Sequence, residues 1–283
     1  MKTRIHLLAA TAVLLLFAAS ASPQQKPGAG KAAWQPVGLS GGGAMFAPAI
    51  SPADPKLMMI NCDMSGAYIT TDGGQNWKMI HLSQLRSSTR CKPAFHPTDT
   101  NIIYAAQGWQ QGMKISKDGG EKWEGVGNLP GEPIGEIAID PGNPGLMLTG
   151  VEEDVYRSAD AGKNWSRCEG PRGTAIAFHF DQTSPVDRRA CLAATSEGIW
   201  RSDDGGKKWA RKTTGIPGNE FYSFTGGSNA KAKLIVLYCT VPSKEESGKL
   251  AGGIYRSLDR GESWQPVMNK GLNLETKAFD QWA

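Results

Sequence analysis

Residues 257–264 read Ser-Leu-Asp-Arg-Gly-Glu-Ser-Trp and form the last of five copies of one pattern in this 283-residue sequence. The other copies are TTDGGQNW from Thr70, SKDGGEKW from Ser116, SADAGKNW from Ser158 and SDDGGKKW from Ser202. All share Ser or Thr, Asp, Gly and Trp at fixed spacing. The hydroxyl and the carboxylate can accept hydrogen bonds from N–H groups of a tight turn, and the glycine permits a backbone that a side chain would forbid. The tryptophan supplies a large ring to bury against a neighbouring unit. The pattern therefore predicts five Trp-anchored turns between strands.

The copies start 42 to 55 residues apart, which fits one four-stranded blade per copy. First strands are expected at residues 45–50, 92–96, 135–139, 175–180 and 221–224. Apolar second strands are expected at residues 57–62, 102–106, 146–150, 191–195 and 234–240. Short third strands lead into the repeated turns at residues 67–69, 113–115, 155–157, 199–201 and 254–256, and fourth strands start at each tryptophan. No segment keeps a helical period, so the predicted fold is an all-β propeller of four-stranded antiparallel blades, five of them visible.

The N-terminal residues 1–21 have the features of a secretory signal peptide, with Lys2 and Arg4 before an apolar run and small residues up to Ala21. Residues 22–31 are expected to be a flexible leader, and residues 32–283 the propeller. The apolar run is short for a membrane span, so we expect a secreted or periplasmic protein with no membrane attachment after cleavage. The formal net charge of +4 gives no reason to expect nucleic acid as a partner.

The sequence at Trp34, Trp-Gln-Pro-Val, is repeated at Trp264, where it leaves the last copy of the pattern. Residues 33–38 are therefore expected to be a fourth strand that completes the last blade and closes the ring. After the fifth blade only residues 270–283 remain, enough for about one strand. The sequence thus predicts part of a larger ring, of seven blades. The alternative is a five-bladed ring with Trp34 packed on its side.

The five cysteines are odd in number and show no CxxC spacing, which indicates buried small hydrophobic residues with no more than one disulfide among them. The histidines at positions 81, 96 and 179 do not cluster with Cys or acidic residues at ligand spacing. We therefore expect no metal and no cofactor.

Successive turns of a four-stranded blade alternate between two faces, so the turn between the second and third strands lies opposite the repeated turn. Asp63 and Trp109 occupy this opposite turn in the first two blades. The corresponding turn is enlarged in the fifth unit, over residues 241–252. Long loops on one face of a rigid scaffold are where binding usually resides, and this enlarged turn is the candidate contact for a protein partner.

The aspartates of the repeat recur in every unit on the other face. A carboxylate that accepts several backbone N–H bonds is ionised and occupied, so we interpret them as turn stabilisers rather than catalytic groups. They are Asp72, Asp118, Asp160, Asp204 and Asp259.

The repeated turns resemble the Asp-box, or bacterial neuraminidase repeat, of β-propellers. The glycines at 41–43, the segment CDMSGAY from Cys62 and the copy at Thr70 together resemble the first blade of secreted, two-propeller, xyloglucan-degrading glycoside hydrolases. That resemblance implies that Asp63 is the general base of an inverting mechanism, with an acid ~6.5–9.5 Å away. In that family the acid lies on a second propeller. Within this chain, the residues that could take its place are Glu152, Glu153 and Asp154. Sugar binding and turn stabilisation stay open as alternative roles for Asp63.

Trp109 and Gln110 suit a sugar-binding role, because an exposed ring beside amides can stack on a pyranose. Packing between blades is the alternative for Trp109. Glu197, in the opposite-face turn of the fourth unit, is a further candidate for substrate binding. The expected partner is therefore a polysaccharide or glycan.

Other propellers share the repeat without this chemistry. A sialidase needs an arginine cluster to clamp a carboxylate, and no Arg-x-Pro segment stands near the start of this sequence, so that activity is disfavoured. Sortilin-like receptors and assembly-factor propellers use the same repeat for binding alone. A non-catalytic protein- or glycan-binding module is therefore the second hypothesis.

Overall fold

The computed structural model describes residues 43–86, 88–108, 112–218, 220–246 and 249–267, with the side chains of residues 243–250 left aside. The expected signal peptide (1–21), leader (22–31) and ring-closing strand (33–38) lie outside these residues. So do Trp109 and Gln110, and any strand after residue 267.

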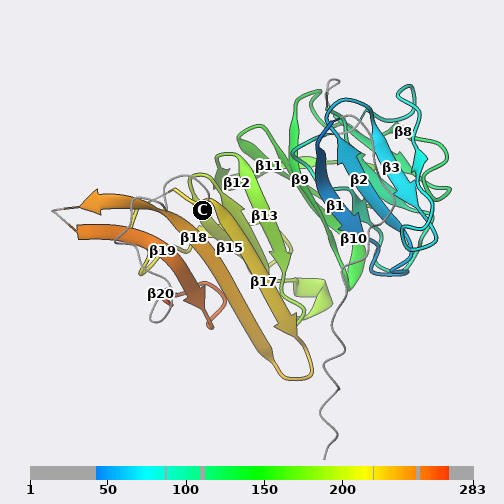
Figure 1. Ribbon diagram of the computed structural model, residues 1–283. Helices are drawn as coiled ribbons and strands as arrows, with labels where there is room; N and C mark the ends of the chain where they lie inside the picture. Colours follow the sequence, from blue (N-terminus) through cyan, green and yellow to red (C-terminus); the bar gives the residue numbers. More distant parts are fainter. Residues whose placement is uncertain (1–42, 87, 109–111, 219, 247–248, 268–283) are drawn as a thin grey trace, which may run out of the picture. The chain divides into compact units, whose positions relative to one another are not determined.

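Five four-stranded antiparallel sheets make up the described chain, each with its strands side by side in sequence order (Figure 1). Blade 1 contains β1 (Met45–Ile50), β2 (Met58–Cys62), β3 (Ala67–Thr70) and β4 (Lys78–Met79). Blade 2 contains β5 (Ala94–Phe95), β6 (Ile103–Ala106), β7 (Met113–Ser116) and β8 (Glu124–Gly125). Blade 3 contains β9 (Ile134–Asp140), β10 (Asn143–Val151), β11 (Asp154–Ser158) and β12 (Ser166–Arg172). These sheets have the β-propeller blade topology that the repeat predicts.

The last two blades follow the same order. Blade 4 contains β13 (Ala175–Phe180), β14 (Cys191–Thr195), β15 (Gly198–Ser202) and β16 (Ala210–Arg211), with the 3-10 turn η1 (Val186–Arg188) between its first two strands. Blade 5 contains β17 (Ser223–Asn229), β18 (Leu234–Glu246), β19 (Lys249–Ser257) and β20 (Gln265–Pro266). No helix among the described residues is long and apolar enough to cross a membrane.

The segment expected to be an enlarged turn at 241–252 is instead mostly paired strand, which corrects that prediction. β18 and β19 continue as a long hairpin (Figure 1), with Lys244 opposite Ala251 and Glu246 opposite Lys249. A register shift between Val241 and Lys244 interrupts the ladder once. The backbone N–H and C=O groups of this segment pair across the two strands, which satisfies them more fully than an open loop would.

Four apolar clusters lie between successive blades and form the core. The cluster between blades 1 and 2 contains Met59 and Ile69 together with Ile103 and Trp123. The other three clusters repeat this arrangement, with Trp165, Trp209 and Trp264 each packed at the junction with the preceding blade. Because each second strand is covered on both sides, β14 is buried at every residue and shows no alternation.

All five cysteines are buried, and none forms a disulfide among the residues that the structure describes. They lie in or beside the packed strands as small apolar side chains. The fold in this region is therefore held by interblade packing and hydrogen bonds.

Candidate functional site

The repeated turns at residues 70–77, 116–123, 158–165, 202–209 and 257–264, called the box turns below, are built by one set of hydrogen bonds. In each turn the Ser or Thr hydroxyl donates to the Asp Oδ1 over 2.7–2.9 Å and accepts the N–H of the glycine over 2.8–3.1 Å. The same Oδ1 accepts the N–H four residues after the Asp over 2.9–3.0 Å. Each Asp therefore contributes several of the contacts that fix its turn.

Hydrogen bonds also set the charge of these carboxylates. The backbone N–H of Asn76 is the largest of the contacts that lower the pKa of Asp72 to about 2. The side-chain amide of Asn164 has the same part in lowering the pKa of Asp160 to about 2. Such groups are ionised at neutral pH and already occupied by donors.

Asp63 lies in the loop between β2 and β3, on the face opposite the box turns. The N–H of Ala44 donates to its Oδ1 over 2.9 Å, and its own N–H donates to the Ala44 carbonyl over 3.3 Å. The residue is exposed, and its Oδ2 has no hydrogen-bond partner among the described residues. One oxygen thus orients the carboxylate while the other can meet solvent or a ligand.

Gly43 is required for this arrangement. Its φ is +105°, and a Cβ at this position would lie 2.5 Å from the Asp63 Oδ1 and 2.9 Å from the Cys62 Sγ. No other residue type fits at that separation. Gly43, the described member of the glycine run at 41–43, is therefore needed for Asp63 to take this position.

Cys62 lies on the buried side of the loop that carries Asp63. It is buried, and its Sγ lies 3.8 Å from the Asp63 Oδ1. Burial alone would raise the pKa of this thiol. Hydrogen bonds from the Ser65 side chain and from the backbone of Met64 and Ser65 outweigh burial, so the pKa is lowered. The loop that carries Asp63 is therefore rich in donors that face inward.

A pocket of about 400 Å³ opens beside Asp63. We call it the Asp63 pocket; it is lined by Asp63, Ser88, Thr89, Arg90, Gln107, Gly108, Pro133 and Ile134. These residues come from the β2–β3 loop, the connection between blades 1 and 2, the β6–β7 turn and the start of blade 3. All four segments lie at the blade ends opposite the box turns, so the pocket spans three blades on that face.

Asn61 fixes one wall of this pocket. Its side chain is buried, and its Nδ2 donates to the carbonyl of Ser88 over 2.6 Å and to that of Cys91 over 3.2 Å. The segment that carries Thr89 and Arg90 is thereby tied to β2, the strand that ends one residue before Asp63. The base of the pocket is a preformed part of the junction between blades 1 and 2.

The acidic residues of the β10–β11 turn, Glu152 and Glu153, and the first residue of β11, Asp154, do not line the Asp63 pocket. Asp154 forms ion pairs with Arg167, at 2.9 Å, and with Arg172. Glu152 and Glu153 are exposed, and the N–H of Glu152 donates to the carbonyl of Pro133 over 3.1 Å. Glu152 is thus joined through its backbone to a pocket residue, whereas Asp154 is engaged by two guanidinium groups.

Glu197 is exposed in the turn between β14 and β15 and does not line the pocket either. Its carbonyl accepts a hydrogen bond from the Arg211 Nη2 over 2.7 Å. The neighbours of Trp109 on its N-terminal side, Gln107 and Gly108, do line the pocket. The alternation of turns between the two faces predicts this position for the second-blade turn.

Glu136 on β9 is a titratable group that sequence reasoning missed. Burial raises the pKa of this carboxyl to about 7, and Lys92 offsets part of the increase. The only sequence signal is an acidic residue inside the otherwise apolar run Ile-Gly-Glu-Ile-Ala-Ile. β9 is the strand whose first residue, Ile134, lines the Asp63 pocket.

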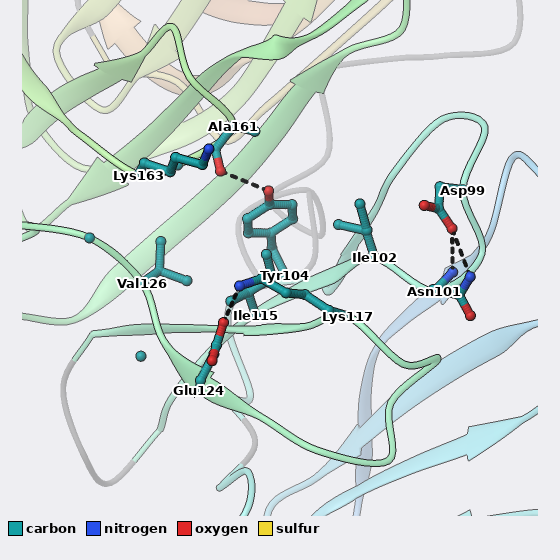
Figure 2. A pocket seen from close by; sticks show the side chains of 13 residues that line it. Asp99, Asn101, Ile102, Tyr104, Ile115, Lys117, Glu124, Val126, Ala161 and Lys163 are labelled. Carbon is teal, nitrogen blue, oxygen red and sulfur yellow. Dashed lines mark hydrogen bonds and ion pairs between the residues drawn. The ribbon is translucent and has the colours of Figure 1, made fainter.

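A second pocket, of about 390 Å³, lies on the box-turn side between blades 2 and 3 (Figure 2). The Tyr104 hydroxyl crosses it to donate to the Ala161 carbonyl over 2.9 Å, and Lys117 pairs with Glu124 at its rim. At the next junction Arg157 reaches the corresponding carbonyl, that of Gly205. Ile115 stands at the position of that arginine in blade 2 and lines this pocket.

The sequence matches two family models: BNR/Asp-box repeat over residues 68–79, and Sortilin, neurotensin receptor 3, over residues 153–279. Together with the five four-stranded sheets, these matches define the chain as an Asp-box β-propeller protein.

Among curated relatives, the chain is similar to the xyloglucanase Xgh74A of Acetivibrio thermocellus, with 28% identity over 268 residues that cover 84% of this chain and 28% of the relative. It is 21% identical over 227 residues to the oligoxyloglucan-reducing end-specific xyloglucanase of Emericella nidulans, covering 77% of this chain and 26% of the relative. The chain therefore spans little more than a quarter of the length of these relatives.

Solved structures agree on the fold. An ancestral GH74 enzyme superposes with a TM-score of 0.65 at 20% identity, over 83% of this chain and 32% of that one. The GH74 xyloglucanase from Xanthomonas campestris gives a TM-score of 0.60 at 21% identity, over 82% and 39% of the two chains. The described blades thus have the same fold as part of these glycoside hydrolases.

Proposed function

We propose that this chain is the base-carrying propeller of a xyloglucan-degrading glycoside hydrolase and that it binds a β-glucan chain in the Asp63 pocket. The observation that carries the proposal is the placement of Asp63. Its carboxylate is oriented by one backbone N–H, has one oxygen without a described partner, and stands at the wall of a pocket. The similarity to xyloglucanases supplies the substrate class.

In the proposed reaction Asp63 is the general base. Its carboxylate takes a proton from a water molecule as the water oxygen bonds to the anomeric carbon, while an acid donates a proton to the departing glycosidic oxygen. The two carboxyl groups of an inverting pair stand ~6.5–9.5 Å apart to leave room for that water. Among the candidates of this chain for the acid, we favour Glu152 and Glu153 over Asp154, because Asp154 is paired with two arginines.

We also propose that the protein is exported. A polysaccharide substrate is found outside the cell, and residues 1–21 have the charge and apolar pattern of a signal peptide. Appearance of the protein in the medium or periplasm, with the mature chain beginning after Ala21, is the expected result of fractionation and N-terminal sequencing.

Substitution of Asp63 tests the activity. Asp63→Asn keeps the shape of the side chain and removes the proton acceptor, so reducing-sugar release from xyloglucan by the full-length protein should fall ~10²–10⁴-fold. Asp187→Asn is the matched control, because Asp187 is an exposed carboxylate on the box-turn face. Equal release by wild type and Asp63→Asn would remove Asp63 from the mechanism.

A binding module without catalysis is the second candidate, and the match to the sortilin model over residues 153–279 favours it. The long β18–β19 hairpin would then be the contact with a protein partner. If the wild-type protein binds a glycan but releases no sugar under the conditions in which xyloglucanases are active, this function is favoured over hydrolysis.

A further inference from the structure

The side-chain oxygen of Gln107 is an anomaly of the Asp63 pocket. This Oε1 is buried and has no hydrogen-bond partner among the residues that the structure describes. Buried side-chain polar atoms are nearly always paired in folded proteins, and the exceptions call for an explanation. Gln107 also lines the Asp63 pocket, so a rotation of its side-chain amide towards that pocket would let a bound ligand supply the missing partner.

The backbone around Gln107 is well fixed. Its N–H donates to the Gly112 carbonyl over 2.9 Å, and the N–H of Gly108 donates to the Arg86 carbonyl over 3.0 Å. The side chain therefore starts from a position that the β6–β7 turn and the preceding connection both determine. An unpaired atom at such a position is a property of the site rather than of a loose loop.

A side-chain amide accepts hydrogen bonds through its oxygen and donates them through its nitrogen, so its partner must be a hydrogen-bond donor or acceptor. As placed, Oε1 accepts a hydrogen bond. If the amide were rotated by half a turn, Nε2 would occupy the same place and donate. A hydroxyl satisfies both orientations, and a sugar carries several hydroxyls on one rigid ring.

The other pocket residues fit the same ligand. Thr89 and Arg90 are exposed at the wall and provide a hydroxyl and a guanidinium that can pair with ring oxygens and hydroxyls. Pro133 and Ile134 form an apolar side on which the C–H face of a pyranose can lie. Polar groups at a few positions around an apolar surface are typical of small-ligand sites.

We propose that Gln107 is a substrate-binding residue whose side-chain amide pairs with a sugar hydroxyl in the Asp63 pocket. This rests on the proposed function, because it assumes that the pocket receives the glucan chain. It goes beyond that function because it assigns one hydrogen bond of the protein–sugar complex to the side chain of Gln107. This residue lies outside the Asp63 loop and outside the box turns.

Isothermal titration of the full-length protein with a xyloglucan oligosaccharide tests the assignment. Gln107→Met keeps the length of the side chain and removes the amide, so the sugar should bind about 5- to 20-fold more weakly, the loss expected for one hydrogen bond to a buried group. Gln182→Met, at an exposed glutamine on the box-turn face, should bind like wild type.

Thermal unfolding without sugar separates binding from folding. Because Gln107→Met replaces an unpaired buried polar atom by an apolar one, its Tm should equal or exceed that of wild type. Weaker binding with an undiminished Tm supports the proposal. Equal affinity of Gln107→Met and wild type overturns it while leaving the proposed function intact, and absence of sugar binding by wild type overturns both.

Discussion

Two kinds of aspartate in this chain show how surroundings decide the use of one residue type. Asp160 in a box turn accepts bonds from a hydroxyl, a backbone N–H and an amide, which fill its oxygens and lower its pKa to about 2. Asp63 accepts one backbone N–H and stands at a pocket wall. The first arrangement fixes a turn, whereas the second leaves one oxygen without a described partner, as the proposed role of general base requires.

Glu136 makes stability depend on pH near neutrality. Its pKa is about 7 in the folded chain against 4.5 when unfolded, so between these values the folded state holds a proton that the unfolded state releases. Stability should therefore fall as pH rises from 5 to 8, by roughly 1–3 kcal/mol after allowance for partial exposure. Glu136→Gln cannot ionise and should flatten this dependence in urea unfolding at the two pH values. An unchanged slope would contradict the assignment.

At the scale of the strand, the apolar pattern of the sequence predicts the bounds of some strands correctly. β1 and β14 fall at the residues expected from the apolar pattern. β17 starts two residues later than expected and β18 runs six residues further. Pairing partners rather than local preference set the ends of these strands, and a single sequence does not reveal which backbone groups will face each other.

The candidate site was less accessible to sequence reasoning. The position of Asp63 between β2 and β3 follows from counting strands, because turns alternate between faces. The pocket beside it does not, since Arg90, Gln107 and Ile134 come from separate segments that meet only when three blades pack. The unpaired Oε1 of Gln107 is likewise a property of packing, which no spacing in the sequence encodes.

The junction between blades 1 and 2 depends on Asn61. Asn61→Ala removes the donor to two carbonyls, those of Ser88 and Cys91, and should lower the free energy of unfolding by about 1–3 kcal/mol. Because the same bonds hold the pocket wall, sugar binding should weaken as well. Urea unfolding measures the first effect, with Asn143→Ala, at an exposed asparagine, as control. Stability and affinity both equal to wild type would show that the wall is held by other contacts.

At the scale of the whole described chain, stability is distributed over the junctions between successive blades. Each apolar cluster joins strands of two neighbouring blades, and each contains the tryptophan of the later one. An array of this kind is stabilised mainly by nearest-neighbour interfaces. A substitution that weakens one junction should therefore destabilise mainly the two blades that share it.

The junction of blades 3 and 4 also contains a buried ion pair. The Arg189 Nε lies 2.8 Å from the Asp140 Oδ2, with side-chain exposures of 3% and 0%. The Arg189 Nη1 donates to the carbonyls of Asp181 and Ser184 over 2.8 and 2.7 Å. One guanidinium thus satisfies a carboxylate of β9 and two carbonyls of the loop after β13.

Removing one member of this pair should be much worse than removing both charges. Arg189→Met leaves the Asp140 carboxylate buried without its counter-ion, and the free energy of unfolding should fall by about 3–5 kcal/mol. The double variant Asp140→Asn/Arg189→Met lacks both charges of the pair and should recover part of that loss. Urea unfolding of both variants measures the difference, and hydrogen exchange should show the loss of protection concentrated in β9–β16. A decrease below about 1 kcal/mol for Arg189→Met would mean that solvent reaches Asp140 and that apolar packing alone joins these blades.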